Sequence, residues 1–252
     1  MTHPNFFDRN RRIVDAVVGL LVLVYVLAIS PGAARAQSAA GNAPIKIGII
    51  GAGNIGGTMA RLWVKADHPV LLSSRHPEEI KPLADSLGAL ARAGTVRDAL
   101  AFGDVILMAV PYGAYPQIAK DYGKDFAGKI VVDAGNAVIA RDGEIAKPAR
   151  ENGVGLTTAK LFPGARIVRA FNILGTGRLK EMANHPGSRF AIPVAGNDQE
   201  ALKVVSALVR EAGFEPVIVG PLERSKLFEQ GGPLYGAQMS ADEMREKLKT
   251  LP

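Results

Sequence analysis

The chain has 252 residues and a formal net charge of +6, from 30 Lys and Arg residues against 24 Asp and Glu residues. It has no cysteine, which excludes disulfides, cysteine nucleophiles and thiolate metal sites. The basic residues form no dense run and no aromatic ladder accompanies them, so nucleic-acid binding is not supported. The length suits one enzyme-sized unit with a main domain and a small second lobe.

The first 36 residues have the features of a targeting segment. Arg9, Arg11 and Arg12 form a positive region, which an uncharged apolar stretch follows at 16–29. Ala34-Arg35-Ala36 then resembles a cleavage site. A transmembrane helix needs about 20 apolar residues, so we expect a cleaved signal peptide on an exported, periplasmic protein, with a membrane anchor as the alternative. Arg11-Arg12 loosely resembles a twin-arginine signal, and the export route stays open.

A strand and a glycine-rich turn follow an Ala-, Ser- and Gly-rich linker at 37–44. The Ile-rich run 45–50 is typical of a buried parallel strand. The glycines that follow allow a sharp turn and a close approach of the backbone to a pyrophosphate, and a helix predicted over about 54–66 points its first amides at that charge. The motif comprises Gly51, Ala52, Gly53, Asn54, Ile55 and Gly56. Its position between a strand and a helix predicts a dinucleotide-binding site.

The end of the second strand, predicted at 69–73, indicates which dinucleotide is bound. An NAD site usually carries Asp or Glu about 20 residues past the glycines, where it binds the ribose 2′-hydroxyl. No acid lies at 73–76, where Ser74 and Arg75 offer a hydroxyl and a guanidinium instead. Charge-assisted donors of this kind suit a 2′-phosphate. We therefore predict NADP as the cofactor.

Strands alternate with amphipathic stretches along the rest of the chain. Further strands are predicted at 104–110, 129–133, 166–172, 190–195 and 215–219, and the clearest helix at 198–212. This alternation indicates an α/β, Rossmann-type fold with a doubly wound, mostly parallel sheet, whose ligands bind at the carboxyl ends of the strands. We expect an NADP-binding domain over 45–165 and a smaller C-terminal substrate or acceptor lobe over 166–252.

The ordered set of motifs resembles the coenzyme F420-dependent NADP oxidoreductases and the related NADP-binding domains of the metalloreductases. The resemblance covers about residues 45–229. Its markers are the glycine motif, Ser73-Ser74-Arg75, Ala109-Val110-Pro111-Tyr112, Val168-Arg169-Ala170-Phe171-Asn172, Val194-Ala195-Gly196-Asn197-Asp198, and the stretches 213–217 and 220–222. The set is specific for the superfamily and not for the electron acceptor.

The resemblance implies roles for particular residues. It implies pyrophosphate contacts through the backbone amides of Gly53, Asn54 and Ile55, and a 2′-phosphate site at Ser74 and Arg75.

On the reacting side, the resemblance places Val110, Pro111 and Tyr112 beside the ribose and nicotinamide. It places Asn172, Gly175 and Thr176 near the nicotinamide amide and a second, flavin-like ring. The chain departs from the family at 230–236, where a Gly-rich stretch replaces an apolar helix. This departure leaves the acceptor pocket and the oligomer contacts open, with a homodimer as one option.

Other oxidoreductase chemistries lack their motifs. No Tyr is followed by Lys four residues later, as short-chain dehydrogenases require. Lys180 and Asn184 imitate the spacing of the β-hydroxyacid dehydrogenases, which keeps an imine or hydroxyacid reductase as an alternative. None of the four histidines has metal-ligand spacing with another, so no metal site is predicted.

This shortage of acid–base groups favours hydride transfer to a flat ring. Transfer between nicotinamide C4 and C5 of a deazaflavin, or N5 of a flavin, needs proximity and orientation first. Small residues at 109–111 and at 175–176 would let two rings stack. We therefore predict NADP with coenzyme F420 or a flavin as acceptor, and no dedicated catalytic side chain. A non-catalytic NADP-binding subunit or sensor is a further alternative.

Overall fold

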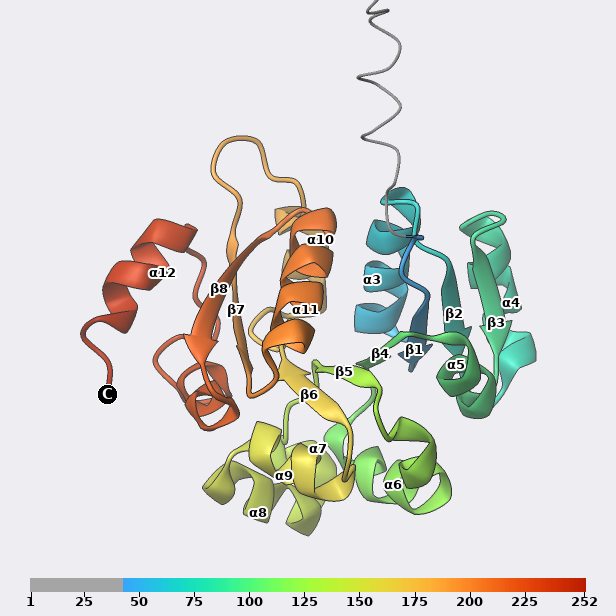
Figure 1. The fold of residues 1–252 in the computed structure, drawn as a ribbon, viewed down its shortest axis with the longest axis horizontal. Coiled ribbons are helices and arrows are strands. Elements are labelled where there is room, and N and C mark those ends of the chain that lie inside the picture. The colour runs from blue at the N-terminus through green and yellow to red at the C-terminus, as the bar shows by residue number, and fades with distance from the viewer. Residues whose placement is uncertain (1–42) are drawn as a thin grey trace, which may run out of the picture. The chain divides into compact units, whose positions relative to one another are not determined.

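The computed structural model describes residues 43–252 (Figure 1). Pro44–Pro252 forms one compact unit. The predicted signal segment at 1–36 and most of the linker lie outside the described residues. Within residues 43–252, no helix combines the length and the apolar character that a membrane span requires.

One eight-stranded sheet runs through the unit in the order β3-β2-β1-β4-β5-β6-β7-β8. The strands are β1 (Ile47–Ile50), β2 (Val70–Ser73), β3 (Ala91–Gly94), β4 (Val105–Met108), β5 (Ile130–Asp133), β6 (Arg166–Arg169), β7 (Ala191–Gly196) and β8 (Glu215–Gly220). The first six strands are parallel, and β7 pairs antiparallel with β6 and parallel with β8. The predicted α/β, mostly parallel Rossmann-type sheet is confirmed.

The central strands are buried on both faces, which explains their unbroken apolar sequences. In β4, Val105 and Leu107 belong to one core cluster, whereas Ile106 and Met108 belong to the other. This division follows from the alternation of side chains across a sheet. The edge strand β3 was not predicted from the sequence.

Helices cover both faces of the sheet (Figure 1). The first core cluster receives α3 (Asn54–Lys65), α4 (Pro77–Ser86) and α11 (Gln199–Glu211), and the second receives α5 (Val96–Phe102), α6 (Tyr115–Tyr122), α8 (Ala146–Asn152) and α9 (Val154–Leu161). Shorter elements are α7 (Ile139–Asp142), α10 (Thr176–Met182) and α12 (Ala241–Leu248). The fully buried Trp63 joins α3 to α11, because its Nε1 donates to the carbonyl of Leu208 over 3.0 Å.

The direction of the sheet reverses between β6 and β7, where Val168 pairs with Gly196 and Arg169 with Ala195. The predicted domain boundary at 165/166 falls at the start of β6. However, β6 pairs along its length with β5, and the sheet continues to β8 without a break into a second unit. Residues 166–252 therefore extend the first sheet instead of forming a separate lobe.

The Gly-rich stretch at 230–236 follows β8 and a 3₁₀ segment, η4 (Leu222–Phe228). Leu234 in this stretch is fully buried, and its N–H donates to the carbonyl of Leu227 over 2.8 Å. The N–H of Gly236 donates to the carbonyl of Ile173, shortly after β6, over 3.1 Å. These contacts hold the stretch close to the carboxyl end of β6.

Candidate dinucleotide and acceptor site

The glycine motif forms a tight connection between β1 and α3. Gly51 has φ +102°, which favours glycine, and a Cβ there would lie 2.6 Å from the carbonyl oxygen of Ala109. A Cβ on Gly56 would overlap the carbonyl oxygen of Gly51. Both glycines are therefore required by backbone packing, which lets the start of α3 lie close against the end of β1.

Gly53 differs from these two glycines because it faces open space. A Cβ at Gly53 would meet no atom within 4 Å. Gly53 is the N-cap of α3, its helix has no side-chain cap, and no acidic residue lies in the first turn. The first amides of a helix have no partner within the helix and carry partial positive charge. The open cradle at Gly53, Asn54 and Ile55 thus fits the pyrophosphate of a dinucleotide.

The carboxyl end of β2 lies beside the glycine motif, because Ser73 is in register with Ile50 of β1. The Ser73 hydroxyl donates to the carbonyl of Ile49 over 2.9 Å and belongs to the core. The Ser74 hydroxyl accepts from the N–H of His76 over 3.1 Å, and Arg75 is exposed with no ion pair among the described residues. A hydroxyl and an unpaired guanidinium at this position suit a 2′-phosphate.

A cavity of about 400 Å³ opens next to the glycine motif at the carboxyl ends of the strands. Gly53, Asn54 and Ile55 line one side, and Ala109-Val110-Pro111 after β4 lines another. Asn172 and Gly175 line it from the segment after β6. The structure thus brings seven of the fourteen residues that the sequence singled out to this cavity: Gly53, Asn54, Ile55, Val110, Pro111, Asn172 and Gly175.

Several predicted residues lie elsewhere. Gly51, Ala52 and Gly56 shape the turn and do not line this cavity, and Ser74 and Arg75 lie beyond it. Thr176 begins α10.

Tyr112 lies in the core and not beside the cavity. Its side chain is 1% exposed, and it packs against Tyr115 with ring centroids 4.9 Å apart. The residue was expected beside the nicotinamide because it follows Pro111. The 3₁₀ turn η1 (Tyr112–Ala114) instead directs its ring into the second core cluster. Burial raises the pKa of the Tyr112 hydroxyl, and the Asp133 carboxylate raises that pKa further.

Two side chains that line the cavity were missed by sequence reasoning. Arg141 comes from α7, and Tyr235 comes from the Gly-rich stretch. Neither belongs to a recognisable motif, and Tyr235 is far in sequence from the glycine motif. The stretch that departs from the family therefore contributes an aromatic wall to the cavity.

A buried ion pair supports the wall formed by Ala134-Gly135-Asn136. Nη1 of Arg169 lies 3.0 Å from Oδ1 of Asp133, and both side chains are fully buried. The same nitrogen donates to the carbonyl of Gly135 over 2.7 Å. The Tyr115 hydroxyl donates to Asp133 over 2.7 Å, and burial raises the pKa of Tyr115 with a further contribution from Asp133. This network fixes the backbone that faces the cavity.

Asn136 and Asn172 link the walls after β5 and β6. The Asn136 side-chain amide donates to the carbonyl of Asn172 over 2.8 Å, and the Asn172 amide donates to the carbonyl of Phe228 over 2.9 Å. The preceding residue, Phe171, has φ +63°, which is unusual for a bulky side chain. Its ring is held at 6.0 Å from that of Trp63, so the core stabilises this turn.

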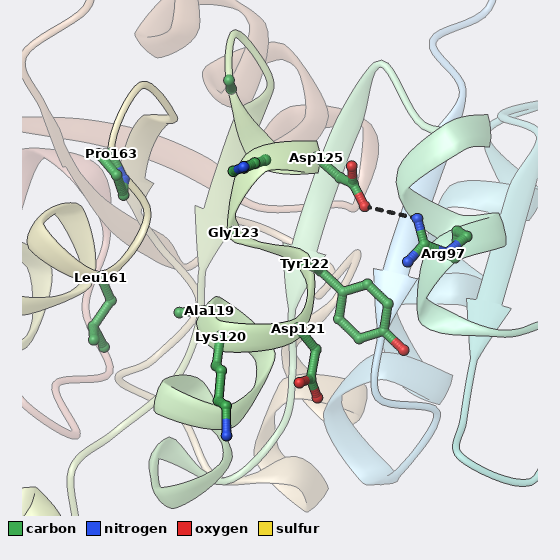
Figure 2. A pocket seen from close by; sticks show the side chains of 11 residues that line it. Arg97, Ala119, Lys120, Asp121, Tyr122, Gly123, Asp125, Leu161 and Pro163 are labelled. Atoms are coloured by element: carbon green, nitrogen blue, oxygen red, sulfur yellow. Dashed lines mark hydrogen bonds and ion pairs between the residues drawn. The ribbon is translucent and has the colours of Figure 1, made fainter.

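A second cavity of about 700 Å³ lies away from this site (Figure 2). Its lining comes from α5, α6, the 3₁₀ segment η2 (Gly123–Phe126) and the end of α9. Nη1 of Arg97 lies 3.3 Å from Oδ2 of Asp125, and the guanidinium lies 5.4 Å from the ring centroid of Tyr122. No residue of the glycine motif lines this cavity, so it is not the dinucleotide site.

Comparison with known proteins shows a family match over the first half of the described fold. Residues 46–137 match the model of the family described as NADP oxidoreductase, coenzyme F420-dependent. The matched stretch includes the glycine motif, Ser74-Arg75 and the wall after β4. Residues 46–137 thus carry the domain of the coenzyme F420-dependent NADP oxidoreductase family. This match, together with the relatives described below, confirms the predictions of the family resemblance and of an NADP-dependent oxidoreductase.

Two relatives differ in how much of their length the chain covers. The metalloreductase STEAP3 of Rattus norvegicus is 29% identical over 184 residues, which represent 73% of this chain and 36% of that protein. The F420-dependent NADP reductase of Methanocaldococcus jannaschii is 26% identical over 205 residues, or 75% of this chain and 90% of that protein. The chain thus spans about a third of the metalloreductase and nearly all of the F420-dependent reductase.

A solved structure shares most of the described fold. The crystal structure of a hypothetical protein from Sinorhizobium meliloti is 32% identical and has a TM-score of 0.69. The match covers 78% of this chain and 95% of that chain.

Proposed function

We propose that the protein transfers hydride between NADPH and a flavin-like or deazaflavin acceptor, with coenzyme F420 as the leading candidate. When bound, NADPH supplies the hydride. The amides of Gly53, Asn54 and Ile55 hold its pyrophosphate, and Ser74 with Arg75 holds its 2′-phosphate. The name of the Methanocaldococcus jannaschii relative supports F420 as the acceptor.

The composition of the cavity carries this proposal. Among the described residues that line it, none is His, Lys, Asp or Glu. Small side chains at Ala109, Ala134 and Gly175 leave room for flat rings. A Cβ on Gly175 would meet no atom within 4 Å. Reduction of a flavin-like ring needs proximity and orientation from the protein, whereas reduction of a carbonyl needs a positioned acid.

One lining side chain favours a second candidate function. The Tyr235 hydroxyl is a proton donor in reach of the cavity, so a keto compound or imine is an alternative acceptor. Lys180, the donor suggested by its spacing to Asn184, does not support that chemistry. It is exposed on α10 and does not line the cavity.

Stopped-flow and steady-state NADPH oxidation with a panel of acceptors tests the proposal. The panel contains F420, FMN, riboflavin, a quinone, a keto acid and a cyclic imine. We expect turnover with the ring acceptors in the wild type, and the same turnover in Tyr235→Phe within about twofold. Turnover restricted to the keto acid or imine, and lost in Tyr235→Phe, would establish the alternative. Tight NADPH binding without oxidation by any acceptor would indicate a sensor.

A further inference from the structure

Arg141 is a cation on the cavity wall, held in place by a buried carboxylate. Its Nε donates to Oδ1 of Asp142 over 2.9 Å, and its Nη2 donates to Oδ2 over 2.8 Å. Nη2 also donates to the carbonyl of Asn136 over 2.7 Å. The Asp142 side chain is 2% exposed and accepts from the N–H of Val138 over 2.9 Å. The guanidinium is thus fixed by three hydrogen bonds before any ligand arrives.

The same guanidinium keeps hydrogen-bonding capacity for a ligand. Its side chain is 47% exposed and lines the cavity, and Nη1 has no hydrogen-bond partner among the described residues. Burial would raise the pKa of Asp142, but hydrogen bonds from Arg141 and Val138 hold that pKa below its ordinary value. The pair therefore stays ionised at neutral pH, with an oriented donor facing the cavity.

Tyr235 adds an aromatic surface to the same cavity. Its side chain is 39% exposed, although its neighbour Leu234 is fully buried. The backbone on either side is hydrogen-bonded to Leu227 and Ile173. An exposed aromatic ring that is held by a buried neighbour offers a face for contact with a flat ligand ring at small entropic cost.

We infer that Arg141 and Tyr235 bind the acceptor ring, with the Tyr235 ring against its flat surface and Arg141 donating to its N1–C2=O edge. This inference rests on the proposed function. In the reaction, hydride leaves NADPH, which becomes NADP⁺, and forms a C–H bond at C5 of a deazaflavin, or an N–H bond at N5 of a flavin, so that the ring gains two electrons. Negative charge spreads to N1 and the C2 carbonyl, and N1 then takes a proton from water. A guanidinium at that edge stabilises the charge as it develops.

The inferred contacts suit a planar, pyrimidinedione-fused ring, whereas simple quinones lack the edge that Arg141 would contact. The glycine motif and Ser74-Arg75 lie on the cofactor side, so Arg141 is expected to contribute little to NADPH affinity.

The experiment compares Arg141→Gln, Tyr235→Leu and Tyr235→Phe with the wild type. Arg245→Gln is the matched control, because Arg245 is 52% exposed, pairs with Asp242 over 2.7 Å, and lies on α12 outside the cavity. The acceptors are coenzyme F420 and its riboflavin-like deazaflavin analogue, which lacks the phosphate tail. Readouts are kcat, KM, the NADPH Kd from fluorescence, and a spectroscopic titration of the N1 proton of the bound reduced deazaflavin.

We expect Arg141→Gln to lower kcat about tenfold or more with both acceptors and to leave the NADPH Kd within about twofold. The pKa of the bound N1–H should rise by about one unit, because a nearby cation favours the anion. Tyr235→Leu should raise KM for both acceptors by more than Tyr235→Phe does, because only the leucine removes the aromatic ring, whereas the control Arg245→Gln should match the wild type.

Three results would overturn the inference. If Arg141→Gln lowers kcat with F420 alone, Arg141 binds the phosphate tail instead of the ring. If the variant raises the NADPH Kd, Arg141 binds the cofactor. If the variant changes neither the kinetics nor the pKa of the bound N1–H, Arg141 has no role in binding the acceptor ring. A wild type that turns over neither deazaflavin nor the flavins FMN and riboflavin overturns the proposed function itself and the inference with it. A wild type that reduces both deazaflavins, beside an equally active Arg141→Gln, overturns the inference alone.

Discussion

The two sides of the cavity are built differently. The cofactor side is formed by backbone from neighbouring parts of the sequence, where Gly51 and Gly56 allow close packing and Gly53 leaves an open cradle. The acceptor side is formed by side chains from distant segments, including Arg141 and Tyr235, on a wall supported by the buried Arg169–Asp133 pair. A local backbone motif can be recognised from sequence, whereas a wall assembled by tertiary contacts cannot.

The largest expected effect is a loss of stability, and it tests the buried Arg169–Asp133 pair that supports the acceptor side of the cavity. Arg169→Met would leave the Asp133 carboxylate buried without its cation, which typically costs about 3–5 kcal/mol of unfolding free energy. The matched control is Arg166→Met on the same strand, whose partly exposed pair with Asp198 is 2.6 Å long. That variant should cost about 1 kcal/mol or less. Urea denaturation measures both, and equal losses would show that the buried pair has no special role.

The next prediction concerns the cofactor side. Gly51→Ala should lower the free energy of unfolding by about 2–4 kcal/mol, because φ +102° disfavours alanine and the Cβ would press on the Ala109 carbonyl. Gly53→Ala should change stability by less than about 1 kcal/mol, because its Cβ enters open space. Thermal and urea denaturation separate the two. If Gly53→Ala is the less stable variant, the packing account of the motif is wrong.

Gly175→Val tests whether hydride transfer needs the open space between the cofactor side and the acceptor side of the cavity. The added side chain would enter the open cavity, so two rings could no longer approach to the roughly 3–3.5 Å that transfer requires. We expect turnover to fall by about two orders of magnitude, with NADPH affinity nearly unchanged. Single-turnover kinetics and an NADPH titration give both values. Full activity in this variant would exclude ring stacking at Gly175.

The smallest expected effect is a change in the preference for NADPH over NADH. Arg75→Ala should weaken NADPH binding by about tenfold, since a charge-assisted hydrogen bond contributes about 1.5–3 kcal/mol. NADH binding should hardly change, because NADH has no 2′-phosphate. Competitive titration of the two cofactors measures the ratio, and an equal loss for both would place Arg75 away from the phosphate.

The β1–α3 turn and the central strands could be predicted from the sequence, whereas β3, the reversed direction of β7 and the position of Tyr235 could not. The β1–α3 turn and the apolar central strands were predictable because each is encoded by adjacent residues. Strand β3, with the sequence Ala-Arg-Ala-Gly, lacks the β-branched residues that indicate a strand and depends on pairing with β2. The reversal at β7 and the approach of Tyr235 to the cavity depend on contacts between distant segments. No local pattern encodes those contacts.

The hydrogen bond from Gly236 to Ile173 has a consequence for how the protein is made. The residues of the family match, 46–137, leave the ribosome well before Tyr235 does. Tyr235 therefore reaches the cavity only after the glycine motif and the strands within 46–137 have been synthesised.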